Sequence, residues 1–333
     1  MTEEPCLISR RHALAAAALL AVFPMTTQAQ TAPSSWPDRP IRFVVPYTPG
    51  GGTDTVTRHI ADKITQDTQW AFVVDNRAGG GGNIGLDFVA KSKPDGYTIG
   101  MGQTANLAIN PAALAKMPFD VVKDLVPVAL VAEVPTVLVV RTDSPWKSLA
   151  DLIAAAQARP GQITQALAGN GTVGHLAGEM LARKAGFKVL NVPYKGAAPA
   201  ITDLLGGQTD YMFATPQAVL GMLAGGKLRA LAVTSAKRVA VLANVPTVAE
   251  QGYKGFEAVD WKMIVAPAGT PTEIVKRLNA ATAKALTQPS MLAKLAEEGS
   301  SAMSGSPQEV ARYLKSEQTA WGAVIREAGI KFE

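Results

Sequence analysis

The sequence contains two glycine-rich stretches that decide the fold, Tyr47-Thr48-Pro49-Gly50-Gly51-Gly52-Thr53-Asp54 and Asn76-Arg77-Ala78-Gly79-Gly80-Gly81-Gly82-Asn83. Each follows a short apolar run typical of a β-strand, residues 41–46 and 71–74, and each is expected to open a helix. Glycines before a helix leave backbone N–H groups unpaired at the positive end of the helix dipole, where small anions bind. The two loops therefore indicate an anion receptor.

Around these loops, short β-rich runs alternate with amphipathic stretches. This alternation predicts an α/β chain with largely parallel sheets. The expected strands are residues 41–46, 71–74, 97–101, 136–141, 163–168, 189–192, 211–214, 228–233 and 263–266. The expected helices include residues 54–65, 149–158, 175–185, 198–205, 271–286 and 307–328.

The length of 333 residues predicts two domains, because a single core rarely grows beyond about 250–300 residues. The alternation is interrupted at residues 141–146 and again at 250–256. If the chain crosses between domains at both places, residues 30–142 and 257–333 form domain 1, and residues 143–256 form domain 2. The two crossing segments would then form a hinge.

The N-terminal residues 1–29 have the layout of a secretory signal peptide. Arg10 and Arg11 precede an uncharged stretch, residues 13–25, and small residues follow as far as Ala29. A membrane anchor is the weaker interpretation, because the apolar stretch is shorter than the roughly 18–20 residues that span a bilayer. We expect a periplasmic protein cleaved near Ala29. The paired arginines favour twin-arginine export, with the general route as the alternative.

The composition argues against several kinds of chemistry. Cys6, the only cysteine, lies in the expected signal peptide, so the mature protein should have no disulfide, thiol nucleophile or thiolate metal ligand. Beyond the signal only His59 and His175 remain, and no metal-binding or serine-nucleophile motif is present. The net charge of +5 comes without a basic run, so no nucleic-acid partner is expected. We predict no catalytic residue, no metal and no cofactor.

The second glycine stretch also satisfies a dinucleotide-binding pattern. Gly80, Gly82 and Gly85 are spaced as G-x-G-x-x-G after an expected strand. However, the stretch follows the second strand instead of the first, and the acidic residue near the required offset, Asp95, lies in a turn pattern. The dinucleotide interpretation is therefore disfavoured.

A third stretch, Ala168-Gly169-Asn170-Gly171-Thr172-Val173-Gly174-His175, also joins a strand to a helix. Thr172 is suited to cap that helix, and His175 is more typical of a helix-start residue that contacts backbone than of a general base. If the middle block is a domain of its own, this loop faces the other two across a cleft. Asp54 has two interpretations: it or Thr53 caps the first helix, which we favour, or it meets a water or an amino group of the ligand.

Six segments, in a fixed order, carry a family resemblance. They are PYTPGGGTD (residues 46–54), NRAGGGGNIG (76–85), KPDGYTI (93–99), GHLAGE (174–179), VPYKGAAPA (192–200) and DLLGGQ (203–208). With these segments the chain resembles the Bug-type extracytoplasmic solute receptors, the binding components of tripartite tricarboxylate transporters.

The resemblance implies a two-domain periplasmic-binding-protein fold of type II, with two crossovers and a ligand cleft between the domains. It implies a receptor and not an enzyme, which captures a small carboxylate and delivers it to membrane permease subunits. We expect this receptor to be a monomer. In the family, the first two loops hold the carboxylate through backbone N–H groups and ordered waters. The candidate ligand-binding residues carried over are Tyr47, Gly51, Thr53, Asp54, Ala78, Gly81, Gly82, Asn83, Gly171, Thr172, His175, Thr215 and Asp260.

The sequence departs from the family pattern at Tyr47, where phenylalanine is common, and at Gly52, where proline is common. A tyrosine hydroxyl can donate to a ligand, so these departures leave the identity of the carboxylate open. Two other functions also stay open. One is a receptor or sensor without a permease, and the other is a secreted enzyme acting on a carboxylated substrate, which the shortage of histidines disfavours.

Overall fold

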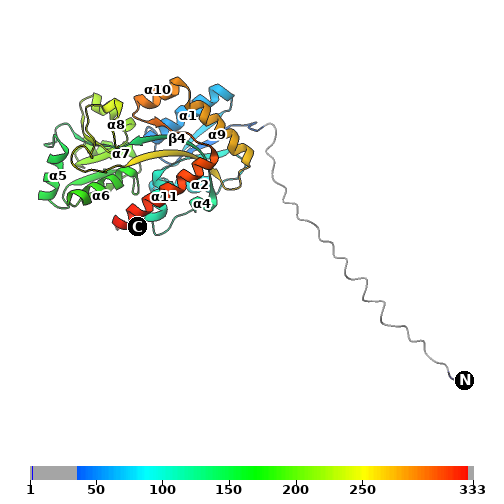
Figure 1. Ribbon diagram of the computed structural model, residues 1–333, viewed down its shortest axis with the longest axis horizontal. Helices are drawn as coiled ribbons and strands as arrows, with labels where there is room; N and C mark the ends of the chain where they lie inside the picture. Colours follow the sequence, from blue (N-terminus) through cyan, green and yellow to red (C-terminus); the bar gives the residue numbers. More distant parts are fainter. Residues whose placement is uncertain (1, 3–35, 329–333) are drawn as a thin grey trace. The chain divides into compact units, whose positions relative to one another are not determined.

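The computed structural model describes Thr2 and residues 36–328 (Figure 1). Apart from Thr2, the expected signal peptide, with Cys6, Arg10, Arg11 and the cleavage site near Ala29, lies outside these residues. Within them the chain forms two β-sheets with helices on their faces, as the alternation of strands and helices predicts. A search of this part of the chain found no helix with the length and apolar character needed to cross a membrane.

The first sheet has six strands in the order β11-β4-β10-β3-β1-β2. Strand β1 is parallel to β2 and β3, whereas β10 is antiparallel to β3 and β4. The strands are β1 (Ile41–Val45), β2 (Phe72–Asn76), β3 (Thr98–Gln103), β4 (Leu125–Pro135), β10 (Val259–Pro267) and β11 (Ser301–Ala302).

Strand β10 shows why this sheet needs helices on both faces. Ile264 and Ala266 belong to one buried cluster, whereas Met263 and Val265 belong to another, because successive side chains of a strand point to opposite faces. One face is covered by α1 (Gly52–Thr68) and α9 (Thr272–Leu286), which pack together. The other is covered by α2 (Asn83–Ala90) and the C-terminal helix α11 (Pro307–Ala328); Figure 1 shows both pairs.

The second sheet has five strands in the order β7-β6-β8-β5-β9. Strand β6 is parallel to β7 and β8, and β5 is antiparallel to β8 and β9. Helices α5 and α6 contribute to the buried cluster on one face, and α7 and α8 to the cluster on the other. The elements are β5 (Val137–Arg141), α5 (Leu149–Ala158), β6 (Thr164–Leu167), α6 (Val173–Ala185), β7 (Leu190–Pro193), α7 (Ala197–Leu205), β8 (Tyr211–Ala214), α8 (Pro216–Ala224) and β9 (Leu228–Val233).

The chain passes from the first sheet to the second between β4 and β5, where Thr136 alone separates the strands, and returns between β9 and β10. Thr234 ties the two passages together. Its hydroxyl accepts from the Thr136 N–H at 2.8 Å and lies 2.6 Å from the Ala258 carbonyl, and all three residues are buried. Compared with the division proposed from the sequence, in which domain 2 begins at residue 143, the second sheet includes one further strand, β5. The cluster of turn residues at 141–146 led to the prediction of a domain boundary there, whereas no such cluster marks the crossing at Thr136 in the sequence.

Strand β4 is a long element that the sequence analysis did not predict. Pro127 lies in its run LVPVALVAEVP, and a proline inside a run argues against a central strand. The structure places Pro127 opposite Val265 at a shift in the register between β4 and β10, where a missing N–H is tolerated. The remaining short elements are the 3-10 turns η1 (Gly80–Gly82) and η3 (Ala240–Leu242), the π-helical turn η2 (Ala105–Ile109), α3 (Asn110–Ala113), α4 (Val121–Asp124) and α10 (Pro289–Glu297).

Candidate ligand-binding site

Two adjoining pockets lie between the elements of the first sheet and those of the second. The inner pocket, of about 70 Å³, is lined by Tyr47, Thr48, residues 51–53, Gln103, Thr136, Ala168, residues 172–174, Ala197, residues 212–215 and Asp260. The glycine-loop pocket, of about 420 Å³, is lined by Tyr47, residues 79–84, Asn110, Leu114, Pro118, residues 168–170 and residues 193–195. Tyr47 and Ala168 line both pockets.

Helix N-termini from both sheets meet at the inner pocket. Gly51 is the N-cap of α1, Gly196 that of α7 and Thr215 that of α8, and none of these three caps offers a side-chain hydrogen bond to its helix. The inner pocket is lined by Gly51 and Thr215 themselves and by Ala197, the first residue of α7. The first N–H groups of a helix need a partner, and the helix dipole favours a negative one. The inner pocket is therefore suited to an anion.

The third loop behaves differently, because its helix is capped from within. The Thr172 hydroxyl accepts from the His175 N–H at 3.3 Å, as predicted for an N-cap residue. The His175 ring is buried, and its Nδ1 accepts from the Gly171 N–H at 3.2 Å. Gly171 and His175 thus shape the loop from behind, and neither is among the residues that line the two pockets.

The buried imidazole gives the protein a pH-dependent stability that we expect to disappear in His175→Gln. Burial lowers the pKa of His175 from 6.5 to about 4 and outweighs the attraction of Glu179, whose Oε1 lies 3.9 Å from Nε2. As the pH falls, the unfolded chain therefore binds a proton before the folded one does. The stabilising contribution is complete above pH 6.5 and declines towards pH 4, by up to about 3 kcal/mol.

Urea unfolding between about pH 7 and pH 4.5 measures this contribution. The free energy of unfolding should fall more steeply with decreasing pH in the wild type than in His175→Gln. Equal slopes for the two proteins would show that the imidazole does not titrate differently on folding.

The second glycine loop is held open by glycine conformations and by Tyr47. Gly79, Gly80, Gly81 and Gly82 all have positive φ, from 58° to 126°, a region that residues with a Cβ rarely adopt. The sequence analysis considered that the Tyr47 hydroxyl can donate to a ligand. In the structure this hydroxyl donates instead to the Gly81 carbonyl at 2.9 Å, so its proton is engaged by the loop. Burial, together with the charge of Asp260, raises the pKa of Tyr47 far above its ordinary value, which keeps this hydroxyl protonated.

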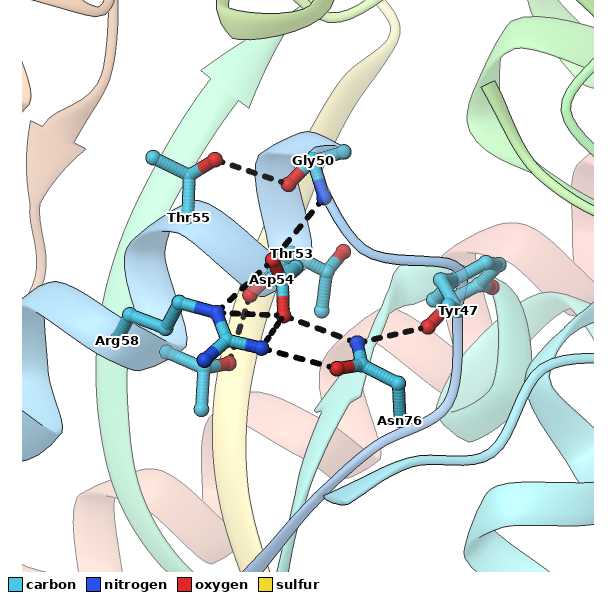
Figure 2. A network of polar contacts seen from close by, with 9 residues as sticks. Tyr47, Gly50, Thr53, Asp54, Thr55, Arg58 and Asn76 are labelled. Carbon is cyan, nitrogen blue, oxygen red and sulfur yellow. Dashed lines mark hydrogen bonds and ion pairs between the residues drawn. The ribbon is translucent and has the colours of Figure 1, made fainter. Parts of the chain in front are cut away.

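Asp54 supports the first loop from below, as Figure 2 shows. Its carboxylate accepts from the Gly50 N–H at 3.0 Å, from Arg58 Nε at 3.1 Å and from Asn76 Nδ2 at 2.9 Å. Burial would raise the pKa of Asp54, but these hydrogen bonds and the Arg58 charge outweigh it and lower the pKa below the ordinary value. The N-cap itself is Gly51 and not Asp54 or Thr53, so Asp54 reaches back from the first turn to the residue before the cap.

The structure brings nine of the thirteen candidate residues to the pockets. The inner pocket receives Tyr47, Gly51, Thr53, Thr172, Thr215 and Asp260, and the glycine-loop pocket receives Tyr47, Gly81, Gly82 and Asn83. The other four, Asp54, Ala78, Gly171 and His175, are not among the lining residues.

Several lining or supporting residues were missed by the sequence analysis. Gln103 lines the inner pocket, and Asn110, Tyr194 and Lys195 line the glycine-loop pocket. Asn110 Nδ2 donates to Asn83 Oδ1 at 3.1 Å, and Asn106 Oδ1 accepts from the Gln103 N–H at 2.9 Å. Asn106 and Asn110 are four residues apart at the π-helical turn η2 that follows β3. Polar residues directly after a strand, and Tyr194 and Lys195 inside a family segment, were the available signals.

Asp260 and Lys262 form an ion pair on β10. Lys262 Nζ lies 3.2 Å from Asp260 Oδ2, and the two side chains are 0% and 5% exposed. Asp260 lines the inner pocket. The pair places one carboxylate beside the proposed anion site, and its charge is balanced within the protein by Lys262. Elsewhere in the described chain, no cluster of three or more His, Cys, Asp or Glu residues is suited to hold a metal ion.

Comparison with known proteins agrees with this architecture. The model of the tripartite tricarboxylate transporter family receptor matches residues 56–330. Among solved structures, "R. palustris Rpa4515 with adipate" is 40% identical with a TM-score of 0.86, and the match covers 89% of this chain and 99% of that one. The periplasmic binding protein BugD is 33% identical with a TM-score of 0.85, covering 90% and 100%. MatC from Rhodopseudomonas palustris, with bound malate, is 32% identical with a TM-score of 0.82, covering 87% and 99%.

These matches confirm the Bug-type resemblance and the two-domain periplasmic-binding-protein fold. Proteins of this family bind solutes as receptors and are not enzymes, which agrees with the absence of a catalytic motif from the sequence. The chain therefore belongs to the tripartite tricarboxylate transporter family receptors, as a periplasmic solute-binding protein.

Proposed function

We propose that this receptor captures a small carboxylate in the inner pocket and delivers it to the membrane permease of a tripartite tricarboxylate-type transporter. The observation that carries the proposal is the convergence of the N-termini of α1, α7 and α8, without side-chain caps, on one pocket between the two sheets. A carboxylate there accepts N–H groups that otherwise lack partners, and each such hydrogen bond to a charged group adds about 1.5–3 kcal/mol.

The ligands of related structures support a carboxylate over other anions. Rpa4515 is described with adipate and MatC with malate, and both ligands are dicarboxylates. In this chain the ligand-binding residues would be the nine candidates that line the pockets, with Asp54, Gly171 and His175 holding the loops in shape. The two domains that close on the ligand would be those divided from the sequence, 30–142 with 257–333 and 143–256, with the first boundary moved to Thr136 because β5 belongs to the second sheet.

Ligand capture is tested by a thermal-shift screen of the mature protein, beginning after Ala29, against dicarboxylates, tricarboxylates, acidic amino acids and aromatic acids. At 100 times its dissociation constant, a bound acid should stabilise the protein by about 2.7 kcal/mol. Amides of the same acids serve as matched controls, because they keep the size of the ligand but lack the charge. Failure of every acid to shift the transition, or equal shifts by acids and amides, would refute carboxylate capture.

Delivery requires a separate test in cells. A strain that lacks the receptor should lose uptake of the identified acid, and the full-length chain should restore it only when the permease subunits are present. Uptake that does not depend on the receptor would instead favour a sensor without a permease.

A further inference from the structure

The inner pocket contains a carboxylate oxygen for which the described residues supply no hydrogen-bond donor. This oxygen is Oδ1 of Asp260, a residue that is 4% exposed and lines the pocket. The other oxygen, Oδ2, is bound to Lys262 Nζ at 3.2 Å. A buried, unpaired acceptor costs free energy, and native proteins leave few of them.

Three polar side chains that line the inner pocket with Asp260 are already engaged with other partners. The Tyr47 hydroxyl donates to the Gly81 carbonyl at 2.9 Å. The Thr53 hydroxyl donates to Gln103 Oε1, and the Gln103 side chain is also hydrogen-bonded to Tyr47. None of these three side chains can therefore turn to Oδ1 without breaking a contact of its own. A donor on the molecule that enters the pocket would pair with Oδ1 without breaking any of these contacts.

We propose that Asp260 selects carboxylates that also carry a hydrogen-bond donor, a hydroxyl or an ammonium group, close to the carboxylate. This proposal rests on carboxylate binding at the inner pocket. The helix N-termini of α1, α7 and α8 receive the carboxylate, and Asp260, which enters the same pocket from β10, receives the donor. Because the pocket measures only about 70 Å³, the two groups must be separated by few atoms. Hydroxy acids and amino acids meet this requirement, whereas unsubstituted acids leave Oδ1 unpaired.

The first test compares acids of equal length that differ by a single group. Calorimetric titration of the wild-type receptor with succinate, malate and aspartate, and with glutarate, 2-hydroxyglutarate and glutamate, gives the ratio of dissociation constants within each set. The hydroxy or amino member should bind about tenfold more tightly or better than the unsubstituted member, because it adds a hydrogen bond to a charged group. Comparison of the hydroxy member with the amino member of each set shows whether the pocket prefers a hydroxyl or an ammonium donor.

The outcomes separate this proposal from the function on which it rests. If no acid of any kind binds, carboxylate capture itself fails. If unsubstituted acids bind as tightly as their substituted counterparts or more tightly, capture stands and the selection by Asp260 is wrong.

The second test removes the acceptor together with its counter-charge. In the double variant Asp260→Ala, Lys262→Met, the preference for the substituted acid should fall to a ratio near one, whatever the absolute affinity. A matched control is Glu273→Ala, Lys276→Met, which removes an exposed ion pair with an N–O distance of 2.9 Å on α9 and should keep the wild-type ratio. If the double variant at 260 and 262 still prefers the substituted acid, Asp260 is not the group that selects it. The wild-type titrations decide the question if that variant does not fold.

Discussion

Replacing Gly81 with alanine is expected to weaken carboxylate binding about 10- to 100-fold, the equivalent of roughly 1–3 kcal/mol of overpacking in a closed site. A Cβ on Gly81 would lie 2.6 Å from the carbonyl oxygen of Asn170, which belongs to the loop after β6 in the second sheet, and 3.2 Å from Asn110 Nδ2. The first of these neighbours is backbone and cannot turn away. The two sheets would therefore have to stand further apart, and the helix N-termini would no longer meet around the ligand.

A matched control separates this obstruction from backbone strain. Gly81 has φ +64° and Gly161 has φ +74°, so alanine at either position carries a similar conformational cost, but nothing lies within 4 Å of a Cβ on Gly161. Thermal unfolding without ligand should show similar losses of stability in the two variants, and calorimetric titration should show weakened binding in Gly81→Ala alone. Wild-type affinity in Gly81→Ala, or an equal loss in Gly161→Ala, would refute the close approach as the cause.

Lys262→Met is expected to lower the free energy of unfolding by about 3–5 kcal/mol, because it leaves Asp260 buried without a counter-charge. Lys262 is fully buried and Asp260 nearly so, and the structure places no other cation in an ion pair with that carboxylate among the residues described. Urea unfolding near pH 7 measures the loss.

The double variant Asp260→Ala, Lys262→Met should recover most of that stability, because an apolar pair has no charge to desolvate. Glu273→Ala, Lys276→Met, at an exposed ion pair, should change the free energy of unfolding by less than about 1 kcal/mol. If the double variant at 260 and 262 is less stable than Lys262→Met alone, the stability of this region does not depend on charge balance.

The sequence predicts most of the strands because their signal is local. Residues 41–46 and 211–214 are short apolar runs bounded by turn residues, and both are strands in the structure. Strand β4 cannot be predicted in this way, because Pro127 argues against a strand. Its pairing with β10 is what shows that Pro127 lies at a register shift. The crossing at Thr136 cannot be predicted in this way either, because the hydrogen bonds that define it come from Thr234 and Ala258, about a hundred residues further along the chain.

The candidate site likewise combines features that the sequence predicts with contacts that the fold alone reveals. Glycine loops before helices are visible in the sequence. Each loop begins where a strand ends, and this position brings the loops to the two pockets. Which side chains support the loops is decided by distant contacts. Tyr47 follows β1 and contacts Gly81, which follows the neighbouring parallel strand β2. Asn110 follows the π-helical turn η2 and contacts Asn83 at the start of α2. No spacing in the sequence reveals either contact. The bond from Asn76 to Asp54 is likewise known only from the fold, whereas Arg58 lies four residues after Asp54 on the same helix, a spacing that the sequence does show.

The tie made by Thr234 has a consequence for the entropy of ligand capture. Because one hydroxyl joins both passages between the sheets, independent twisting or sliding of the two halves at these passages would break its hydrogen bonds. We expect their relative motion to be confined largely to rotation about one axis. Little orientational freedom is then left to lose when the halves come together, so a ligand of only a few atoms can supply the driving force.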